Sequence, residues 1–562
     1  MTTLKQWLNR LLGDVGLVFY LSLFIIGAFL LAALYNPDGV QTVAQKALDA
    51  TADDFGWLYL IVTSGFVIFT LWLGISRFGN IRLGPQDEEP EFSYGSWLAM
   101  IFSGGMGVGL VFWGVAEPIM HFSSPPFGIG EAKTAEAAQT GLRYAFFHWG
   151  LHQWANFAVV GLAIAYVRFR HNSYGLISET FRPLLGKRVD RGWGKAIDTL
   201  AVVSTIFGVA TTLGLGALQI NSGLSRLTGI PYGVQPQMLI IAGLGVLFIL
   251  SAMTPLNRGI RLLSNANMTL ASGLLLFVLL MGPTSFIFSE MTQTLGEYLG
   301  NIIQMSLVTT PYTSGHWVQE WTIFYWAWGL SWAPFVGSFI ARISQGRTIK
   351  EFVLGVMIVP VTLSMLWFST FGGSAIFFDL FHNTGIADAV AIEVPAGLYE
   401  MLSQLPGGYY ASIAAVLLVS MFVVTSADSA TFVLGMFTSK GVLNPTRFVR
   451  ILWGALQLMM AGMLLLSGGL EGLRTVSIVA AFPFMLLMVL MAYSLYLDLN
   501  LEWQRMEEKD KLLKMRVEAL LLREYEREEA RQAEEEAHPT APEEPAAEEP
   551  EKEKPQETTP AA

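Results

Sequence analysis

The sequence predicts an all-α polytopic membrane protein, and three observations carry this prediction. First, 53% of the 562 residues are hydrophobic, only 14% are charged and the mean hydropathy is +0.48, whereas a soluble protein of this size carries far more charge. Second, apolar segments long enough to cross a bilayer recur along the chain. Third, basic residues gather in alternate loops between these segments. We therefore expect about twelve membrane-spanning helices.

The apolar segments follow one another without a long soluble domain between them. The first, Val15–Tyr35, is too long for the apolar part of a signal peptide and lacks a clear cleavage site, so we expect it to remain as a span. The others are Gly56–Ile75, Trp97–Met120, Arg143–Val167, Ala196–Ile220, Met238–Met253, Met268–Phe288, Trp321–Ile343, Phe352–Phe371, Tyr409–Phe437, Phe448–Ser467 and Val476–Leu497.

The loops give the orientation. Lys and Arg follow the second, fourth, sixth, eighth and tenth segments, whereas the loops Gly282–Gly315 and Gly372–Gly407 contain neither. By the positive-inside rule, both termini and every even-numbered loop of this multi-pass protein are cytoplasmic.

Two connections are more than turns. Ser289–Thr309 mixes polar and apolar residues, as expected of an external helix along the membrane surface that joins two halves. The tail Leu501–Ala562 has 10 Lys and Arg against 19 Asp and Glu, so it carries −9 of the net charge of −11. We expect an exposed helix over Leu501–Ala537 and disorder from Pro539. The chain has no cysteine and no feature of a nucleic-acid partner.

The segment Trp321–Thr348 places four tryptophans in one span, at positions 321, 326, 328 and 332. Large aromatic faces at membrane depth predict a cage for an organic cation, because such faces attract quaternary ammonium without a counter-charge. The alternative is an interfacial aromatic belt. Trp328 and Trp332 lie well inside the span, which favours the cage.

Glycines interrupt the third segment at Gly104, Gly105, Gly107 and Gly109. An interrupted helix in a bilayer points to a transport site that uses its exposed backbone, although close packing of small residues gives the same pattern. Glu117 follows and serves either a gate or a helix end.

The fourth segment adds Trp149 and Trp154, which lie about 140° apart if they share one helix. His148 and His152 have the spacing of two metal ligands, but no glutamate lies between them and no third ligand is near in sequence. Hydrogen bonding inside the bundle is the preferred interpretation.

The tenth segment ends in hydroxyl residues, among them Thr425 and Ser426, next to the acidic Asp428. Such oxygens can bind a monovalent cation, or can bond back to their own helix. An intramembrane acid is a functional candidate in itself. No histidine or elbow motif accompanies these residues, so a serine hydrolase, and an enzyme in general, is not expected.

Taken together, GGMGVG, FWGVAEP, HWGLHQWANFAVVGLAIAY, FGVATTLGLGALQIN, WTIFYWAWGLSWAPFVGSFIARISQGRT and VVTSADSA strongly resemble the betaine/choline/carnitine transporter family. The resemblance runs from about Gly13 to about Leu497. It implies twelve helices, a leucine-transporter-type core of two inverted repeats (spans 3–7 and 8–12), alternating access and a homotrimer. The implied divisions are a cytoplasmic N-terminus at 1–14, two peripheral spans at 15–96, the first repeat at 97–288, an external connecting helix at 289–317, the second repeat at 318–500 and a cytoplasmic tail at 501–562.

The resemblance also implies a substrate site. Its members in this sequence are Trp149, Trp154, Phe157, Trp328, Gly329, Trp332 and Met106. Phe157 stands where betaine carriers have Tyr, and Gly329 where they have another Trp, so a wider or more open box is expected. Gly109 stands where choline carriers tend to have Asp, which favours a zwitterion over a bare cation.

Sodium is the one coupling ion implied, with no further cofactor or metal. The implied main site uses Ser103, Met106, Phe422, Thr425 and Ser426, beside the helix break at Gly105, Gly107 and Gly109. A second site would use Thr205 and Phe335, but Val209 replaces a threonine there. Thr211 or Thr212 would have to supply the missing oxygen, so one sodium per substrate is expected.

The expected function is therefore a sodium-coupled symporter that imports a zwitterionic quaternary-ammonium or sulfonium solute for osmoprotection. Glycine betaine is the first candidate, and dimethylsulfoniopropionate or carnitine come after it. One alternative is a sodium-independent or proton-coupled carrier or exchanger for carnitine or choline. An alternative of another class is a membrane osmosensor with a signalling tail.

Overall fold

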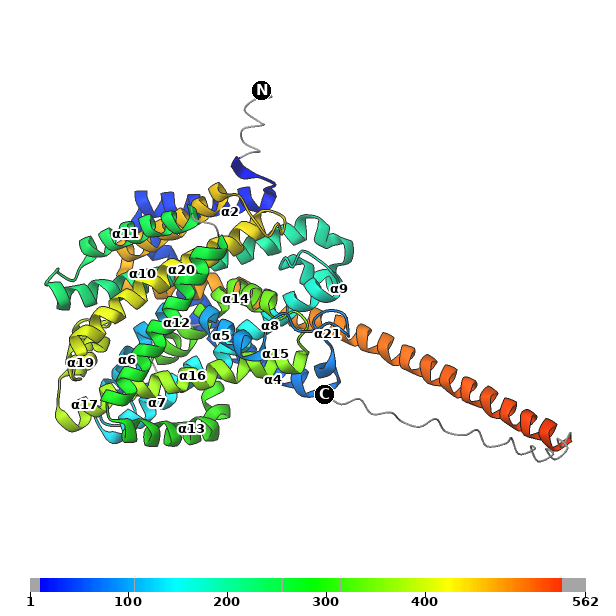
Figure 1. Ribbon diagram of the computed structural model, residues 1–562. Coiled ribbons are helices and arrows are strands. Elements are labelled where there is room, and N and C mark those ends of the chain that lie inside the picture. The colour runs from blue at the N-terminus through cyan, green and yellow to red at the C-terminus, as the bar shows by residue number, and fades with distance from the viewer. Residues whose placement is uncertain (1–10, 106, 254–255, 313–314, 538–562) are drawn as a thin grey trace, which may run out of the picture. The chain divides into compact units, whose positions relative to one another are not determined.

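The computed structural model describes residues 11–105, 107–253, 256–312 and 315–537 (Figure 1). Met106, the first ten residues and the predicted disordered segment from Pro539 lie outside the described residues, as does the side chain of Ser103. Within them the chain is helical and forms no strand, apart from an isolated bridge between Arg82 and Thr348. The chain forms two units, residues 1–498 and 499–562.

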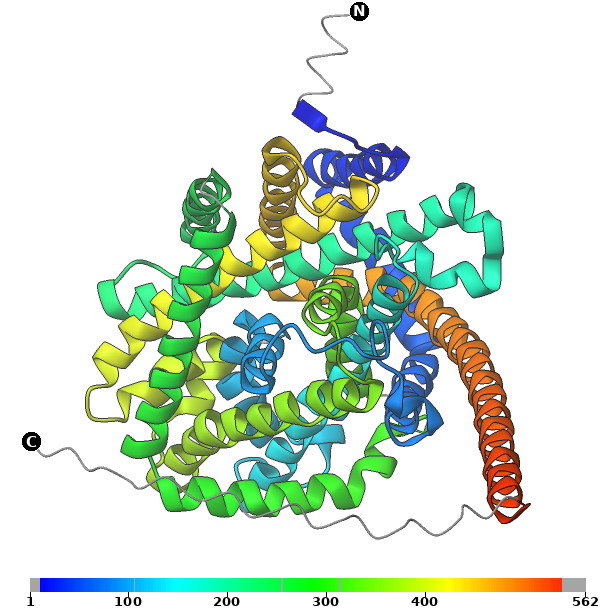
Figure 2. The same cartoon turned by 45° about the vertical axis from the view of Figure 1, so that its right-hand side comes forward.

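The helices of the first unit pack as a bundle around α8, α10 and α14 (Figures 1 and 2). In chain order the α-helices are α2 (Leu17–Tyr35), α3 (Pro37–Leu48), α4 (Gly56–Ile75), α5 (Tyr94–Gly105), α6 (Val108–Ser123), α7 (Ala135–Trp149), α8 (Leu151–Arg170), α9 (Arg182–Leu185), α10 (Gly192–Thr228), α11 (Val234–Met253), α12 (Leu256–Met281), α13 (Thr284–Ser306), α14 (Phe324–Ile343), α15 (Ile349–Met357), α16 (Val359–Phe368), α17 (Ser374–His382), α18 (Ile386–Ile392), α19 (Ala396–Ser403), α20 (Gly408–Thr438) and α21 (Arg447–Ala537).

Within the described residues, seven helices are long and apolar enough to cross a membrane, or up to eight if α12 and α13, which meet at 106°, count as one span. All twelve predicted segments are helical, but several are broken. The third is divided into α5 and α6, of 12 and 16 residues, and the fourth into α7 and α8. A span needs about 20 residues, so these breaks account for part of the difference. The last two segments are joined in α21, with a break at Gly469.

Gly150 divides the fourth segment, and the structure shows why a glycine stands there. Its backbone leaves the helical region, and a Cβ atom at this position would lie 2.7 Å from the Tyr298 hydroxyl of α13. That hydroxyl accepts a hydrogen bond from the Leu151 N–H, one of the unpaired donors at the start of α8. Trp149 and Trp154 consequently belong to two different helices, so the 140° separation expected for one continuous helix does not apply.

Helices α8 and α14 cross at two glycines. A Cβ atom at Gly337 would lie 2.9 Å from the Gly161 nitrogen, and one at Gly161 would lie 3.3 Å from the Gly337 oxygen. Small residues at a crossing let two backbones approach closely in a membrane protein. The crossing sets the spacing of the two helices that carry most of the predicted aromatic box.

Helix α13 occupies the predicted external connection and runs along one edge of the bundle (Figure 2). Ile287, Thr294, Tyr298, Met305 and Ser306 are buried on one of its faces. The tail, described by itself, is helical and exposed through Ala537, with an ion pair of 2.9 Å between Lys511 and Glu507.

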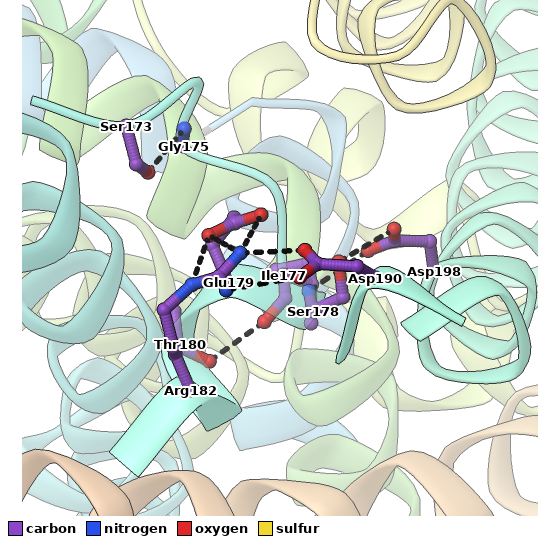
Figure 3. A network of polar contacts seen from close by, with 9 residues as sticks. All are labelled: Ser173, Gly175, Ile177, Ser178, Glu179, Thr180, Arg182, Asp190 and Asp198. Atoms are coloured by element: carbon purple, nitrogen blue, oxygen red, sulfur yellow. Dashed lines mark hydrogen bonds and ion pairs between the residues drawn. The ribbon is translucent and has the colours of Figure 1, made fainter. Parts of the chain in front are cut away.

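The loop between α8 and α10 is held by a polar network (Figure 3). Arg182 donates hydrogen bonds to both carboxylate oxygens of Glu179 and to Asp190. The Ser178 N–H and hydroxyl both donate to Asp198 of α10, at 2.9 and 2.8 Å. These charge-assisted hydrogen bonds favour one conformation of the loop at Glu179, Arg182 and Asp190.

Candidate functional site

Two indoles of the predicted box meet at the broken third segment, and a third packs against one of them. The rings of Trp149 and Trp328 are 6.0 Å apart at 89°, and Trp328 is 6.1 Å from Trp332. A Cβ atom at Gly109 would lie 2.4 Å from the Trp328 ring and 3.0 Å from the Trp149 ring. These indoles therefore approach α6 where it has no side chain.

The other predicted ring pair continues the box along α8. The Trp154 and Phe157 rings are 5.6 Å apart at 89°, and a Cβ atom at Gly105 would lie 2.5 Å from the Trp154 ring. All five predicted aromatic residues are buried. Gly105 and Gly109 of the third segment therefore have a packing role. Because they lack side chains, indole rings from α7, α8 and α14 can lie against the backbone there.

The indole N–H groups of the box have different partners. Trp149 donates to Glu117 at 2.8 Å, and Trp328 to the Gly208 oxygen at 3.3 Å. The N–H groups of Trp154 and Trp332 are buried and have no hydrogen-bond partner in the described part of the chain. A buried N–H without a partner is costly, so a ligand with acceptor oxygens would satisfy these two donors.

The remaining tryptophans of the eighth segment have other roles. Trp321 joins Trp113 and Phe324 around the Arg474 guanidinium, with ring centres 5.1, 5.1 and 5.0 Å from it. Trp326 stacks on His152 at 4.6 Å and 11°. All four indoles of this segment are buried inside the protein, so they do not form an interfacial belt. Of the four tryptophans of this segment, only Trp328 and Trp332 remain candidates for the predicted cage.

Glu117 forms a buried polar cluster beside the box. It lies inside α6, which extends to Ser123, so it does not end the helix. His148 donates from Nδ1 to Glu117 at 2.6 Å and accepts at Nε2 from the Thr322 hydroxyl at 2.9 Å, the arrangement that a neutral imidazole allows. His121 Nε2 is 3.6 Å from the same carboxylate. Glu117 thereby holds both His148 and the box residue Trp149.

The two histidines of the fourth segment do not converge. His152 pairs with Ser306 at 2.9 Å, away from His148, so both make hydrogen bonds inside the bundle, as the preferred interpretation held. A third potential ligand for His148 is nevertheless near in space, because atoms of Glu117, His121 and His148 lie within 4.8 Å of one another. This spacing could hold a metal ion, although hydrogen bonds already engage Glu117 and His148.

The expected opening at Gly329 is not found. A Cβ atom there would lie 2.3 Å from Gln153 Oε1 and 2.6 Å from Gln153 Cδ. The side chain of Gln153, which is buried on α8, therefore fills the space beside Gly329. The prediction of a box that is wider on this side was wrong, because the volume missing from one helix is supplied by the other.

The predicted main sodium site is partly described. Gly107 and Ser426 come together, with 3.6 Å between a Cβ built on Gly107 and the Ser426 hydroxyl. The Thr425 hydroxyl donates to the Met421 and Phe422 carbonyls, so back-bonding to α20 is present. Asn267 of α12 donates to the same hydroxyl at 3.0 Å. Asp428 is engaged by Ser251 of α11.

The residues of the predicted second sodium site make contacts within the protein. Thr205 donates to Ala201 at 2.7 Å, and Val209 is buried without a polar atom to offer. Thr211 bonds to Phe207, Leu473 and Ser477, and Thr212 to Gly208. Phe335 packs against Trp332 at 5.6 Å. The Thr211 and Thr212 hydroxyls donate to carbonyl groups of their own helix, and their oxygen lone pairs could still bind a cation, so the second site stays a prediction.

The sequence reasoning missed Gln153, Asn267 and Arg474. Each is a polar residue in or beside an apolar segment. Polar residues are rare in such segments, and this rarity is the signal that could have identified them.

Comparisons with known proteins identify the family of this chain. Residues 17–504 match the family described as BCCT, betaine/carnitine/choline family transporter. Glycine betaine transporter OpuD of Bacillus subtilis is 48% identical over 510 residues, which are 90% of this chain and 98% of the relative. The ectoine/hydroxyectoine transporter of Virgibacillus pantothenticus is 44% identical, with 88% of this chain and 98% of the relative covered. The osmo-dependent choline transporter BetT2 of Acinetobacter baylyi is 37% identical, with 89% and 72% covered. The family and these relatives are transporters, not enzymes, and the chain belongs to the betaine/carnitine/choline transporter family.

Proposed function

We propose that this protein is a sodium-coupled symporter that imports a zwitterionic onium solute, glycine betaine first, by alternating access. The observation that carries the proposal is the meeting of Trp149 and Trp328 on the side-chain-free face at Gly109, with Trp332 packed against Trp328. Aromatic faces hold a quaternary ammonium group through cation–π attraction without a counter-charge.

The preference for a zwitterion has two supports. Gly109 carries no carboxylate that would neutralise a bare cation, and the rings of Trp149 and Trp328 occupy the space where one would stand. The unpartnered N–H groups of Trp154 and Trp332 are donors that a substrate carboxylate could accept from. Choline lacks that carboxylate, so it is the weaker candidate.

Sodium coupling is supported by the nearness of Gly107, beside the indole box, to Ser426 of α20. An ion bound between these segments would link the broken helix to α20, and would raise substrate affinity by thermodynamic linkage. One sodium per substrate remains the proposal because Val209 offers no oxygen.

Family membership supports the remaining parts of the proposal. These are twelve spans, two inverted repeats, cytoplasmic termini, an inner-membrane location and a homotrimer. In this arrangement α12 and α13 separate at the external surface, and the broken pairs α5/α6 and α7/α8 each count as one span.

The test is binding and uptake by the purified full-length protein. A thermal-shift panel of glycine betaine, carnitine, choline, dimethylsulfoniopropionate and ectoine, with and without sodium, identifies the ligand. Labelled uptake into proteoliposomes under a sodium gradient then measures coupling. Trp332→Leu should lose most betaine binding, whereas the matched control Trp193→Leu, at an exposed position of α10, should not. Uptake that persists without sodium would favour the sodium-independent carrier, and a flux ratio of two sodium ions would overturn the single-ion proposal.

A further inference from the structure

A cavity of about 350 Å³ lies beyond the indole box, towards the ends of α8 and α14. It is lined by residues of α5, α8, α14 and α20, and by the loop at Gly175. Phe335, one of its lining residues, packs against Trp332 of the box. Ser429, another, lies one turn after Ser426 of α20. The volume is within the range of small-molecule sites, about 300–1,000 Å³.

Two arginines, Arg168 of α8 and Arg342 of α14, line this cavity, and no Asp or Glu does. In the described part of the chain neither arginine has a carboxylate within ion-pair distance. Elsewhere the protein pairs its structural arginines closely: Arg182 contacts Glu179 and Asp190, and Arg226 contacts Glu393 and Glu400.

Neighbouring groups position these two arginines, of which Arg342 is exposed and Arg168 half-buried. Gly175 has a φ of 73°, and a Cβ atom there would lie 3.3 Å from the Arg168 guanidinium. Its N–H donates to the Ser173 hydroxyl, and Ser178 nearby is anchored to Asp198 (Figure 3). Arg342 lies over the ring of Phe432, 5.3 Å from its centre. Guanidinium groups held in this way are prepared to receive a planar anion.

We propose that this cavity is a second, cytoplasm-facing site in which Arg168 and Arg342 bind the carboxylate of the substrate after its onium group leaves the indoles. The inference rests on the proposed function, because it needs a zwitterion as cargo. The predicted box residues carry no positive charge, so a carboxylate gains charge-assisted hydrogen bonds only when it reaches the arginines. The ring of Phe335, beside Trp332, supplies an aromatic face for the onium group at the same place, whereas Phe432 already contacts Arg342.

The alternative is that Arg168 and Arg342 serve only to orient the protein in the membrane, as cytoplasmic basic residues do. Each would then be solvated separately, and the pair would select no ligand. A binding site predicts instead that a carboxylate is required. That carboxylate could belong to the zwitterion or to a free organic anion, and acetate separates the two sources.

The experiment is equilibrium binding of labelled glycine betaine to the purified full-length protein with sodium present. We expect a tight phase from the box and a weak phase that acetate does not remove at equal concentration. Arg168→Gln with Arg342→Gln should abolish the weak phase, or weaken it at least about tenfold, and leave the tight phase unchanged. Arg168→Lys with Arg342→Lys should retain part of it, and Lys187→Gln, an exposed charge outside the cavity, should change neither phase.

Labelled choline supplies the second readout, since it has the onium group and no carboxylate. It should show no weak phase in any variant. A weak phase for choline, a weak phase that survives in both double variants, or acetate binding in place of betaine would each overturn the inference. A single tight betaine phase would also overturn it and leave the proposed function standing, whereas absence of all betaine binding would refute the proposed function itself.

Discussion

Replacing Glu117 with Gln tests whether the buried carboxylate positions the box. The carboxylate accepts from the Trp149 indole at 2.8 Å and from His148 at 2.6 Å. Glutamine keeps the shape and removes the charge. The amide oxygen can still accept from Trp149, while its NH₂ group faces His148, which must then adopt the other tautomer.

The size of the effect follows from these contacts. Hydrogen bonds to charged groups contribute about 1.5–3 kcal/mol and neutral ones about 0.5–1.5 kcal/mol, so the hold on Trp149 weakens by about 1 kcal/mol. One aromatic face contributes at most about 2 kcal/mol to a desolvated cation. Betaine affinity should therefore fall by about 5-fold to 30-fold.

Isothermal titration of betaine measures this loss, and Trp149→Phe is the matched variant because it deletes the N–H and keeps an aromatic ring. The double variant of Glu117→Gln and Trp149→Phe should lose little more than Trp149→Phe alone, since both remove the same interaction. Unchanged affinity in Glu117→Gln, or losses that simply add, would refute the positioning role.

Three further predictions concern volume, ion number and acidity. Gly329→Ala alone should lower stability by about 1–3 kcal/mol through crowding against Gln153, and adding Gln153→Ala should recover most of it. Equal melting temperatures for the single and double variants would contradict this. Val209→Thr should restore a hydroxyl at the second ion site and raise the sodium Hill coefficient of uptake above that of the native protein; an unchanged coefficient counts against that site. The hydrogen bond from Arg182 lowers the pKa of Asp190 below its ordinary value of 3.8, so this pair stabilises the loop above that pH and is lost as pH falls. Pepsin cleavage within residues 173–190 should be slower in the native protein than in Asp190→Asn at about pH 5, and this difference should vanish towards about pH 2.5. A difference that does not change with pH would exclude this contribution.

Helix content and the position of the box were predictable because they depend on local composition. Apolar runs of span length identify helices wherever they pack, and tryptophans inside such runs stand out against their neighbours. Trp149 and Trp328 meet at Gly109 of the interrupted third segment, and their role in binding stays a prediction.

Long-range packing was not predictable. Nothing near Gly329 in sequence shows that Gln153, more than 170 residues earlier, fills its place. The role of Trp321 likewise depends on Arg474, which lies some 150 residues further along the chain. The break at Gly150 is fixed by Tyr298 of another helix. Each of these outcomes depends on a contact between distant segments, which a single sequence does not encode in any local pattern.

Arg474 is bound by the rings of Trp113, Trp321 and Phe324 as a ligand would be, but it is part of the same chain. The guanidinium of Arg474 makes the cation–π contacts with these three rings that a free onium compound would otherwise make. Because Arg474 belongs to the same chain, its effective concentration at the rings exceeds that of a dissolved solute. Organic cations are thereby excluded from a second aromatic cluster a few turns from the first. Under the proposed function, the box at Trp328 and Trp332 is then the aromatic cluster left for an onium substrate.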